Sequence, residues 1–385
     1  MTSASYRRSP SLLALCLMFV APVAFAVEGS QPPTIPPVIT ITDMGVVGQN
    51  PVIYGRDGAV STLINGRSMW TFGDTAMSVA GVENHFWDDN SMSWSDNLDA
   101  SHGITLEHDF LDRTGAPGEF LPYLQWERDY NYAHDTNHCT EDPCGAEFAM
   151  WAGFPVADPA RHRALVFYYE LWRVPGQDGW TSVGSGIAVA DSTGKMTRPI
   201  ENPGSKTPTL MWGPDELAYD GGALVVKDTL YSYGCKTAFV SKKCSVARVP
   251  LSAALDKTQW TYYAGNNTWS ANPDDAVIVF KGGAAGNSVF YNAYLGVYMA
   301  IYSGIFNNDI YYRVAREPWG PWSAQALLFT GKDCWGNDNF DYAAEAHTEF
   351  AEQNGKVQYV TYAHTTGFLR MDLPLTRVEF EKPGK

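Results

Sequence analysis

The stretch Arg67–Thr75, RSMWTFGDT, has the alternating aromatic pattern of a β-strand, and four later stretches repeat this design. They are His162–Leu171 (HRALVFYYEL), Asp228–Cys235 (DTLYSYGC), Gly296–Gly304 (GVYMAIYSG) and Lys356–Thr365 (KVQYVTYAHT). Their starts are 95, 66, 68 and 60 residues apart. Each follows an apolar segment that ends in Gly, Asp or Asn, and each precedes a third strand-like run. A repeat of about 40–70 residues built from strands alone is typical of a β-propeller.

The sequence therefore predicts an all-β fold, a single five-bladed β-propeller over residues 38–385. A β-sandwich whose strands happen to be similar is the alternative. The long first interval predicts an insertion in the first blade at about residues 84–145, which contains five of the eight His. A loop of this length is usually functional, although it could also be a stabilising flap. We expect Val38–Thr42 or Thr376–Glu381 to pair with the opposite terminus, because this would close the ring and cover an exposed edge.

The N-terminus has the pattern of a secretory signal over residues 1–26. Arg7 and Arg8 precede an apolar run, and Ala24-Phe25-Ala26 is a small-x-small cleavage site. A transmembrane anchor is the alternative, but the run is shorter than the roughly 20 apolar residues that a spanning helix needs. Residues 27–37 (VEGSQPPTIPP) are expected to be an extended linker. The sequence thus predicts an exported, soluble protein, either extracellular or periplasmic.

The cysteines after the predicted signal fit an oxidising compartment. Cys139 with Cys144, and Cys235 with Cys244, would each close a short loop, which leaves Cys334 unpaired. A zinc site beside Cys139 is the alternative for the first pair, but its spacing does not match a zinc motif. We expect a buried thiol at Cys334 and a monomer, with a disulfide-linked dimer as the alternative.

Composition and missing motifs exclude several functions. The 42 Asp and Glu against 27 Lys and Arg give a net charge of −15, which disfavours nucleic acid and anionic membranes as partners. The sequence has no Gly-x-Ser-x-Gly, P-loop, Rossmann or His-Glu-x-x-His motif, so hydride transfer, nucleotide hydrolysis and serine esterase chemistry lack support.

Propeller geometry predicts where functional side chains converge, because inner strands start, and second strands end, at the same end of the central channel. At the expected inner-strand starts the sequence has Asp43, Glu147, Asp215, Glu216, Asn287, Ser288, Glu345 and His347. At the ends of the second strands it has Asp74, Glu170, Tyr233, Tyr302 and His364. Carboxylates that lie close together raise each other's pKa, and a glycosidase needs one carboxylic acid beside one carboxylate. Nearby Trp and Tyr rings would suit a sugar.

Several of these residues also have a structural explanation. Asp74 and Asp43 could be ordinary turn carboxylates that bond to their own backbone. Glu216 could cap a turn. Glu345 and His347 alternate on one strand face, so they could form a buried ion pair or bind a metal.

Short motifs along the chain resemble a known family. They are Thr42-Asp43-Met44-Gly45, Phe72-Gly73-Asp74-Thr75, Ala247-Arg248-Val249-Pro250, Tyr291-Asn292-Ala293-Tyr294-Leu295-Gly296 and Pro318-Trp319-Gly320-Pro321-Trp322-Ser323. In order and position, from about residue 38 to 375, they resemble secreted five-bladed propellers formerly of unknown function, now described as glycoside hydrolases that include endo-D-arabinofuranases. The resemblance implies a catalytic carboxylate at Asp43 with Asp74 near it. Met44 departs from the usual leucine, and the motifs do not place the partner acid.

The resulting hypothesis is a secreted glycoside hydrolase that cleaves furanosidic, arabinan-like or related linkages in an extracellular or cell-wall polysaccharide. Asp43 is expected to be the nucleophile or base, Glu216 or Glu345 the general acid, and Asp74 a group that adjusts their pKa. The expected substrate-binding residues are His347, Glu147, Trp151, Tyr302 and Asn287, and no metal or other cofactor is required. The main alternative is a non-catalytic carbohydrate-binding propeller. A polysaccharide lyase is disfavoured because the acidic protein would repel polyuronates.

Overall fold

The structure is a computed structural model that describes residues 31–384 except 178, 192–194, 200–202, 239–240 and 337–338. The expected signal sequence and residues 27–30 of the expected linker lie outside the described residues. Residues 32–37 form no strand or helix, and the first strand begins at Val38. From there the described chain is built mostly of β-strands, as the sequence predicted.

Within the described residues, five antiparallel sheets contain four or more strands each. In order of pairing, the first sheet contains β3 (Val60–Ile64), β4 (Arg67–Phe72), β7 (Ser91–Ser95) and β8 (His108–Asp109). The second contains β9 (Glu147–Asp158), β10 (Arg163–Arg173), β11 (Thr181–Ala190) and β12 (Met196–Thr197). The third contains β13 (Ala223–Val226), β14 (Thr229–Ala238), β15 (Ser241–Pro250), β16 (Thr261–Gly265) and β17 (Thr268–Ser270), and β18 (Phe280–Gly282) pairs with β15. The other two are β19 (Ala284–Asn292), β20 (Val297–Ser303), β21 (Asp309–Ala315) and β22 (Ala326–Thr330); and β23 (Tyr342–Ala346), β24 (Val357–Gly367), β26 (Pro374–Phe380) and β1 (Val38–Val46), with β25 (Arg370–Asp372) on β24.

Smaller elements connect these sheets. A further sheet contains β2 (Ile53–Arg56), β5 (Thr75–Met77) and β6 (Trp87–Asp88), and the described residues include one α-helix, α1 (Gln125–His134). The short 3-10 helices are η1 (Val82–Asn84), η2 (Pro159–Arg161), η3 (Leu251–Ala253), η4 (Lys257–Gln259), η5 (Pro273–Asp275), η6 (Thr348–Phe350) and η7 (Gln353–Gly355). Among the described residues no helix is both long enough and apolar enough to cross a membrane.

The five predicted aromatic stretches correspond to β4, β10, β14, β20 and β24, each of which is the second strand of its sheet. On β4 and β20 every residue after the first is buried. Trp70 and Phe72 of β4, for example, are fully buried and stack with their ring centres 6.4 Å apart. Because these strands are covered on both faces, side chains of both alternating sets are buried, and the aromatic residues among them produced the repeat in the sequence.

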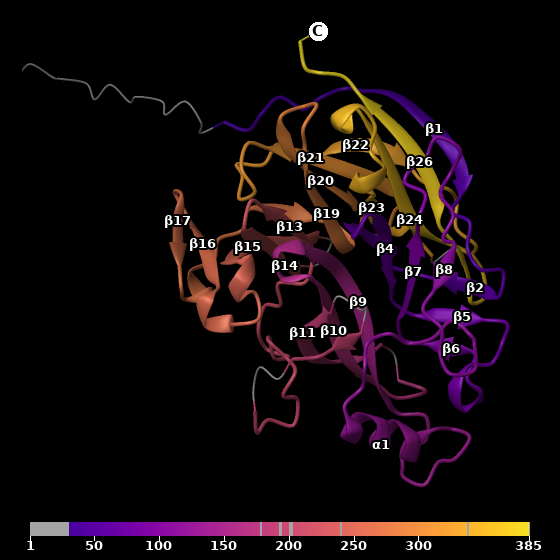
Figure 1. The fold of residues 1–385 in the computed structure, drawn as a ribbon. Helices are drawn as coiled ribbons and strands as arrows, with labels where there is room; N and C mark the ends of the chain where they lie inside the picture. Colours follow the sequence, from indigo (N-terminus) through magenta and orange to yellow (C-terminus); the bar gives the residue numbers. More distant parts are fainter. Residues whose placement is uncertain are drawn as a thin grey trace, which may run out of the picture. The chain divides into compact units, whose positions relative to one another are not determined.

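The first strands of successive sheets pack against one another, β3 on β9, β9 on β13, β13 on β19 and β19 on β23. The short helix η6, which follows β23, contacts β3. In Figure 1, β13, β19 and β23 lie between the outer strands β16 and β17 on one side and β1 and β26 on the other. The arrangement is propeller-like, with first strands inside and later strands outside.

The two ends of the strand-forming chain pair with each other, as expected. β1 pairs antiparallel with β26, with Val38 opposite Phe380 and Asp43 opposite Thr376, and so covers the edge of β26. β1 is therefore the outermost strand of the last sheet, and the innermost strand of the first sheet is β3. The expected position of Asp43 at the start of an inner strand was wrong.

The segment predicted as an insertion, about residues 84–145, contains β6, β7, β8 and α1, so part of it completes the first sheet. Both predicted disulfides are present. Cys139–Cys144 follows α1, and Cys235–Cys244 joins directly opposed residues of β14 and β15. Cys334 is a free, half-buried thiol.

Candidate active site

Two aspartates meet at the end of the first sheet where β3 begins and β4 ends. Asp57 lies just before β3, and Asp74 follows Gly73 after β4; Val60 pairs with Thr71, so both turns are at the same end. The Gly73 N–H donates to the Asp57 carbonyl oxygen at 3.0 Å. A Cβ at residue 73 would lie 2.6 Å from Asp57 Oδ1. Glycine therefore allows the Asp57 carboxyl group to lie against the turn that carries Asp74.

Two neighbouring sheets supply hydrogen-bond donors to this pair. Tyr342, the first residue of β23, donates its hydroxyl proton to Asp57 Oδ2 at 2.7 Å. Trp151 of β9 donates its indole N–H to Asp74 Oδ1 at 3.0 Å, and Arg173 at the end of β10 donates to the same oxygen at 3.3 Å. We call these five residues the Asp57–Asp74 site. Three sheets thus converge on two carboxyl groups.

Burial and mutual charge set the protonation of the pair. Burial is the main cause that raises the pKa of Asp57 to about 7; the charge of Asp74 adds to it, and the Tyr342 hydrogen bond opposes it. Burial also raises the pKa of Asp74, but the charge of Arg173 and the bond from Trp151 oppose that rise. Both aspartates are only half-buried, so solvent reaches them. Burial thus favours the protonated form of both carboxyl groups, and the positive charge of Arg173 counteracts this effect at Asp74.

Arg173 connects Asp74 to two further carboxylates. Its guanidinium group donates to Glu147 and Asp89 as well as to Asp74, and we call these four residues the Arg173 cluster. Burial lowers the pKa of Arg173, but the three carboxylates outweigh burial and the net pKa rises. Burial, followed by the charge of Glu147, raises the pKa of Asp89 well above its usual value. The cluster thus sets three acidic groups against one cation.

Aromatic rings border Asp74. The Trp151 ring stacks on Tyr169 at 6.2 Å between centres and meets the Trp180 ring edge-on at 4.7 Å. Trp180 is 54% exposed, so its indole surface is available to a ligand beside the carboxyl pair. Such a rim of aromatic groups around a few polar ones is typical of small-ligand and sugar sites.

Asp57 has counterparts in two other sheets. Asp220 precedes β13 and accepts a hydrogen bond from Ser185 Oγ at 2.6 Å, while Asp341 directly precedes β23. Burial raises the pKa of both carboxyl groups. Aspartates therefore occupy the start of the first strand in three sheets.

Of the residues predicted from the sequence, the structure brings Asp74, Glu147 and Trp151 together. Trp151 contacts Asp74 directly, and Glu147 is joined to Asp74 through Arg173.

Asp43 and Glu216 lie on the surface in turn-capping positions. The Asp43 side chain is 61% exposed, accepts from the Gly45 N–H at 2.9 Å and pairs with Lys332 at 3.1 Å; the Gly45 bond and then Lys332 lower its pKa. The Glu216 side chain is 46% exposed, accepts from the Gly213 N–H at 2.7 Å and pairs with Lys257 at 2.6 Å. Neither carboxylate has the buried surroundings that a general acid needs.

Glu345 lies on the inner strand β23 and His347 directly follows it, but both side chains are buried inside the molecule. Glu345 accepts from Ser288 Oγ at 3.0 Å, and burial raises its pKa well above the usual value. His347 stacks on Trp70 at 4.0 Å between ring centres and is hydrogen-bonded to Thr361, and burial lowers its pKa to about 3. The histidine is therefore neutral, and the ion pair considered from the sequence does not form.

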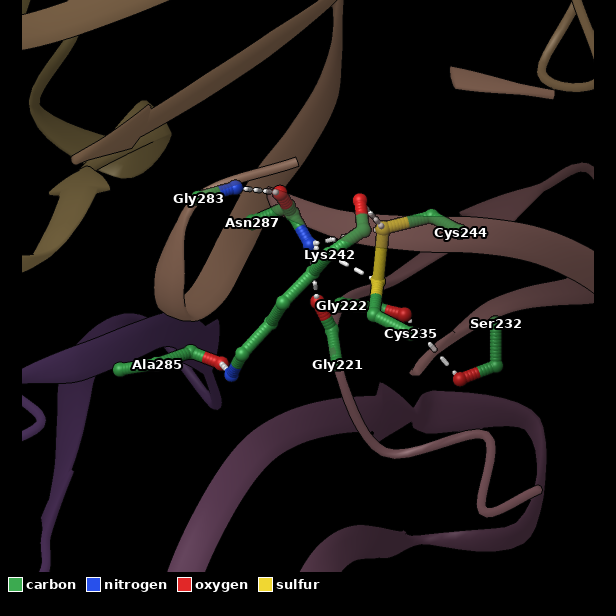
Figure 2. The surroundings of a disulfide bond; sticks show 9 residues. All are labelled: Gly221, Gly222, Ser232, Cys235, Lys242, Cys244, Gly283, Ala285 and Asn287. Atoms are coloured by element: carbon green, nitrogen blue, oxygen red, sulfur yellow. Dashed lines mark hydrogen bonds between the residues drawn. A yellow bond between two sulfur atoms is a disulfide. The ribbon is translucent and has the colours of Figure 1, made fainter. Parts of the chain in front are cut away.

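Asn287 and Tyr302 have packing roles. Asn287 lies beside the Cys235–Cys244 disulfide, donates to the Gly221 carbonyl oxygen at 3.0 Å and accepts from the Gly283 N–H at 3.4 Å, as Figure 2 shows. The buried Tyr302 hydroxyl group accepts from Arg313 Nε at 2.6 Å. These contacts join loops and strands and leave the two side chains satisfied within the fold.

Sequence reasoning missed Asp57, Tyr342 and Arg173. Asp57 had a usable signal, since it stands in the turn NPVIYGRDG before the first aromatic stretch, where an inner strand had to start. Arg173 had no such signal, because the predicted stretch ended at Leu171 whereas β10 continues to Arg173.

Two hollows in the described part of the chain lie apart from this site. One of about 410 Å³ is lined by the β3–β4 turn with Met69, Met92 and Trp94, at the opposite end of β3 from Asp57. The other, of about 440 Å³, is lined by Glu216 and Lys257. Neither hollow is lined by Asp57 or Asp74.

Residues 39–364 match the family described as "Domain of unknown function (DUF4185)". A solved "putative hydrolase" from Bacteroides ovatus ATCC 8483 is 16% identical, with a TM-score of 0.56 over 88% of this chain and 87% of that chain. A family 117 glycoside hydrolase from Zobellia galactanivorans is 12% identical, with a TM-score of 0.48 over 88% of this chain and 90% of that chain. The GH43_1 enzyme from Xanthomonas citri complexed with xylose is 12% identical, with a TM-score of 0.47 over 87% of this chain and 88% of that chain. No curated protein matches the chain. The likeness to the Bacteroides ovatus protein shows a common fold.

Proposed function

This chain belongs to the family described as "Domain of unknown function (DUF4185)", and we propose that it is a glycoside hydrolase with Asp57 and Asp74 as its catalytic carboxyl pair. The observation that carries the proposal is that the turns before β3 and after β4 place these two half-buried aspartates side by side, with donors from two other sheets.

The two aspartates take different roles because their surroundings differ. Asp57, with a pKa raised to about 7, is the general acid that protonates the glycosidic oxygen. Asp74 is the nucleophile, or the base that activates a water molecule, and Arg173 and Trp151 stabilise its charge. Trp180 offers a ring face on which a sugar stacks.

We further propose that the protein is a five-bladed propeller that acts outside the cytoplasm on a furanosidic, arabinan-like polysaccharide. Five sheets whose first strands pack in chain order support the blade count. Two disulfides support an oxidising compartment. The motif resemblance supports the substrate, and the net charge of −15 disfavours a nucleic-acid or membrane partner. The protein acts as a monomer, and this chemistry calls for no cofactor.

Product release from arabinan, arabinogalactan and arabinoxylan tests the proposal, with wild type, Asp57→Asn, Asp74→Asn and Asp43→Asn assayed side by side. Loss of a catalytic acid or base lowers the rate by about 10²–10⁴-fold, so Asp57→Asn and Asp74→Asn should each lose that much activity. Asp43→Asn is the matched control, since Asp43 is exposed and bonded to Lys332 and its own turn. It should retain wild-type activity.

Two outcomes would change this assignment. Activity that survives both Asp57→Asn and Asp74→Asn, or that disappears in Asp43→Asn, would reject the carboxyl pair. Tight binding to one glycan without any product from wild type would instead identify a carbohydrate-binding propeller. Thermal unfolding of each variant confirms that a lost activity does not reflect a lost fold.

A further inference from the structure

We propose that Cys334, Asp341 and His364 bind a divalent ion of the zinc class. Their ligand atoms converge on one point: the Cys334 sulfur lies 3.1 Å from Asp341 Oδ1 and 3.6 Å from His364 Nδ1, and His364 Nδ1 lies 2.8 Å from Asp341 Oδ1. We call these residues the Cys334 cluster. They come from the loop between β22 and β23 and from β24.

The distances suit a tetrahedral ion with small adjustments. Usual zinc bond lengths place ligand atoms at the corners of a tetrahedron about 3.6 Å apart for sulfur and nitrogen, 3.4 Å for nitrogen and oxygen, and 3.6 Å for sulfur and oxygen. The sulfur–nitrogen distance in the cluster already has this value, and the other two are roughly half an ångström shorter. Hydrogen bonds hold the metal-free ligands together, and an ion that replaces the shared protons would separate them slightly.

Burial of the acidic ligand favours a cation at this point. Asp341 is 1% exposed and His364 is 6% exposed. Asp341 Oδ2 is a buried atom with no hydrogen-bond partner among the described residues. A buried carboxylate is costly unless it is paired or coordinates a metal. The His364 contact compensates part of that cost, and a divalent ion would compensate more of it.

Hydrogen bonds hold the described parts of the loop that carries two of the ligands, on either side of residues 337–338. Asn308 accepts from the Asp341 N–H at 3.0 Å and donates to the Lys332 carbonyl oxygen at 3.0 Å, so it ties both arms of the loop. The Trp335 N–H donates to the Thr365 carbonyl oxygen at 2.8 Å, next to His364. Outer hydrogen bonds of this kind orient ligands and contribute to metal affinity.

The donor set indicates which ion fits. One thiolate, one imidazole and one carboxylate suit a borderline-soft ion, whereas calcium and magnesium prefer all-oxygen sites. Three protein ligands leave a fourth tetrahedral position for water. In the described part of the chain the other convergent group is Cys139, Asp142 and Cys144, but its two sulfurs form a disulfide and cannot bind an ion as thiolates.

The test uses purified protein with its free thiol reduced and its metal removed by a chelator. Zinc chloride is titrated by calorimetry, and cobalt(II) serves as a spectroscopic probe because a thiolate bound to cobalt gives a near-ultraviolet charge-transfer band. Cys334→Ser is the main variant, since residue 334 is half-buried and the change is nearly isosteric. His102→Gln is the matched control, because His102 is an exposed histidine outside the cluster.

Wild type and His102→Gln should bind one equivalent of zinc and show the cobalt–thiolate band. Cys334→Ser should lose the band and bind zinc at least about ten-fold more weakly, and Asp341→Asn should also weaken binding. If wild type binds no zinc, or if Cys334→Ser keeps wild-type affinity, the proposal is overturned. Unfolding of the metal-free proteins shows whether each variant is folded. No readout depends on hydrolase activity, so this result is separate from the proposed function.

Discussion

Strand β10 carries two arginine–carboxylate clusters with opposite character. Glu170 and Arg173 are three residues apart on it, so they point to opposite faces of the sheet. On one face Glu170, with Glu127, binds Arg198, and all three side chains are about 1% exposed. We call this the Arg198 cluster. On the other face the Arg173 cluster is more open, with side-chain exposures of 23% for Arg173, 22% for Asp74 and 38% for Glu147, although Asp89 is only 5% exposed.

Access for a substrate, rather than a raised pKa, therefore separates a reactive carboxyl group from a structural one. Burial raises the pKa of Glu170 to about 7, the same value that it gives Asp57. The guanidinium group of Arg198, however, also bonds to Thr209 Oγ1 at 2.7 Å and to the Tyr168 hydroxyl group at 3.2 Å. A substrate cannot reach that closed cluster, whereas it can reach Asp57 and Asp74.

The largest effect on stability is expected for Arg198→Met. Removal of one partner from a buried ion pair leaves uncompensated charge and costs about 3–5 kcal/mol, here for two carboxylates that are almost fully buried. Urea unfolding should report this loss in the free energy of unfolding. Arg173→Met is the matched control, because Arg173, Asp74 and Glu147 are partly open to solvent and the loss should be smaller than for Arg198→Met. Equal losses in the two variants would refute the contrast between a closed and an open cluster.

The same pair of substitutions should have the reverse order of effects on catalysis. Arg173 orients Asp74 and opposes the rise of its pKa, so Arg173→Met should lower kcat/KM by about 10²-fold through misplacement of the carboxylate. Arg198→Met, assayed at a temperature where it is folded, should stay near wild type. Steady-state kinetics on the active substrate measures both, and a fully active Arg173→Met would remove Arg173 from the site.

The fold could be predicted from the sequence where the packing of a strand determines which residues the strand contains. The five second strands are buried on both faces, so their aromatic runs revealed the repeat, and both short-loop disulfides followed from spacing. The pairing of β1 with β26 was expected, but the position of β1 as the outermost strand of the last sheet, rather than an inner strand, leaves no local signal in the sequence. That error placed Asp43 at an inner strand and overlooked Asp57.

The candidate site could be predicted only in part, because the sequence did not show where each strand ends and therefore which side chains lie at the site. Glu170 was expected at the end of its strand, but β10 continues to Arg173, so Glu170 faces the closed cluster and Arg173 faces the open one. Glu345 was placed correctly on an inner strand, yet strand position says nothing about depth, and it is buried. Asp74 was found because its Phe-Gly-Asp-Thr turn follows a well-marked strand.

The pH dependence of activity tests whether Asp57 is the acid. Because Asp57 must carry a proton, kcat/KM should fall as the pH rises through about 7. The Tyr342 hydrogen bond favours the ionised form and lowers this pKa, so Tyr342→Phe should raise it and move the alkaline limb to higher pH by up to about one unit. Tyr294→Phe is the control, since its hydroxyl group contacts Glu381 at 3.5 Å and should leave the profile unchanged. A limb that stays in place, or that moves to lower pH, would mean that another group is the acid.

The smallest effect is expected at the aromatic border of the open cluster. Trp180 is 54% exposed and meets Trp151 edge-on, so Trp180→Ala removes a ring face for the sugar and little of the core. An aromatic contact of this kind contributes about 0.5–1.5 kcal/mol, which corresponds to a rise in KM of roughly two- to ten-fold with kcat nearly unchanged. Trp94→Ala is the matched change at the opposite end of the first sheet, where Trp94 lies beneath the Arg67 guanidinium group and lines a different hollow. Equal changes of KM in both variants would indicate a general loss of packing. A change confined to Trp180→Ala would place the substrate beside Asp74, on the open face of the second sheet rather than at the closed Arg198 cluster.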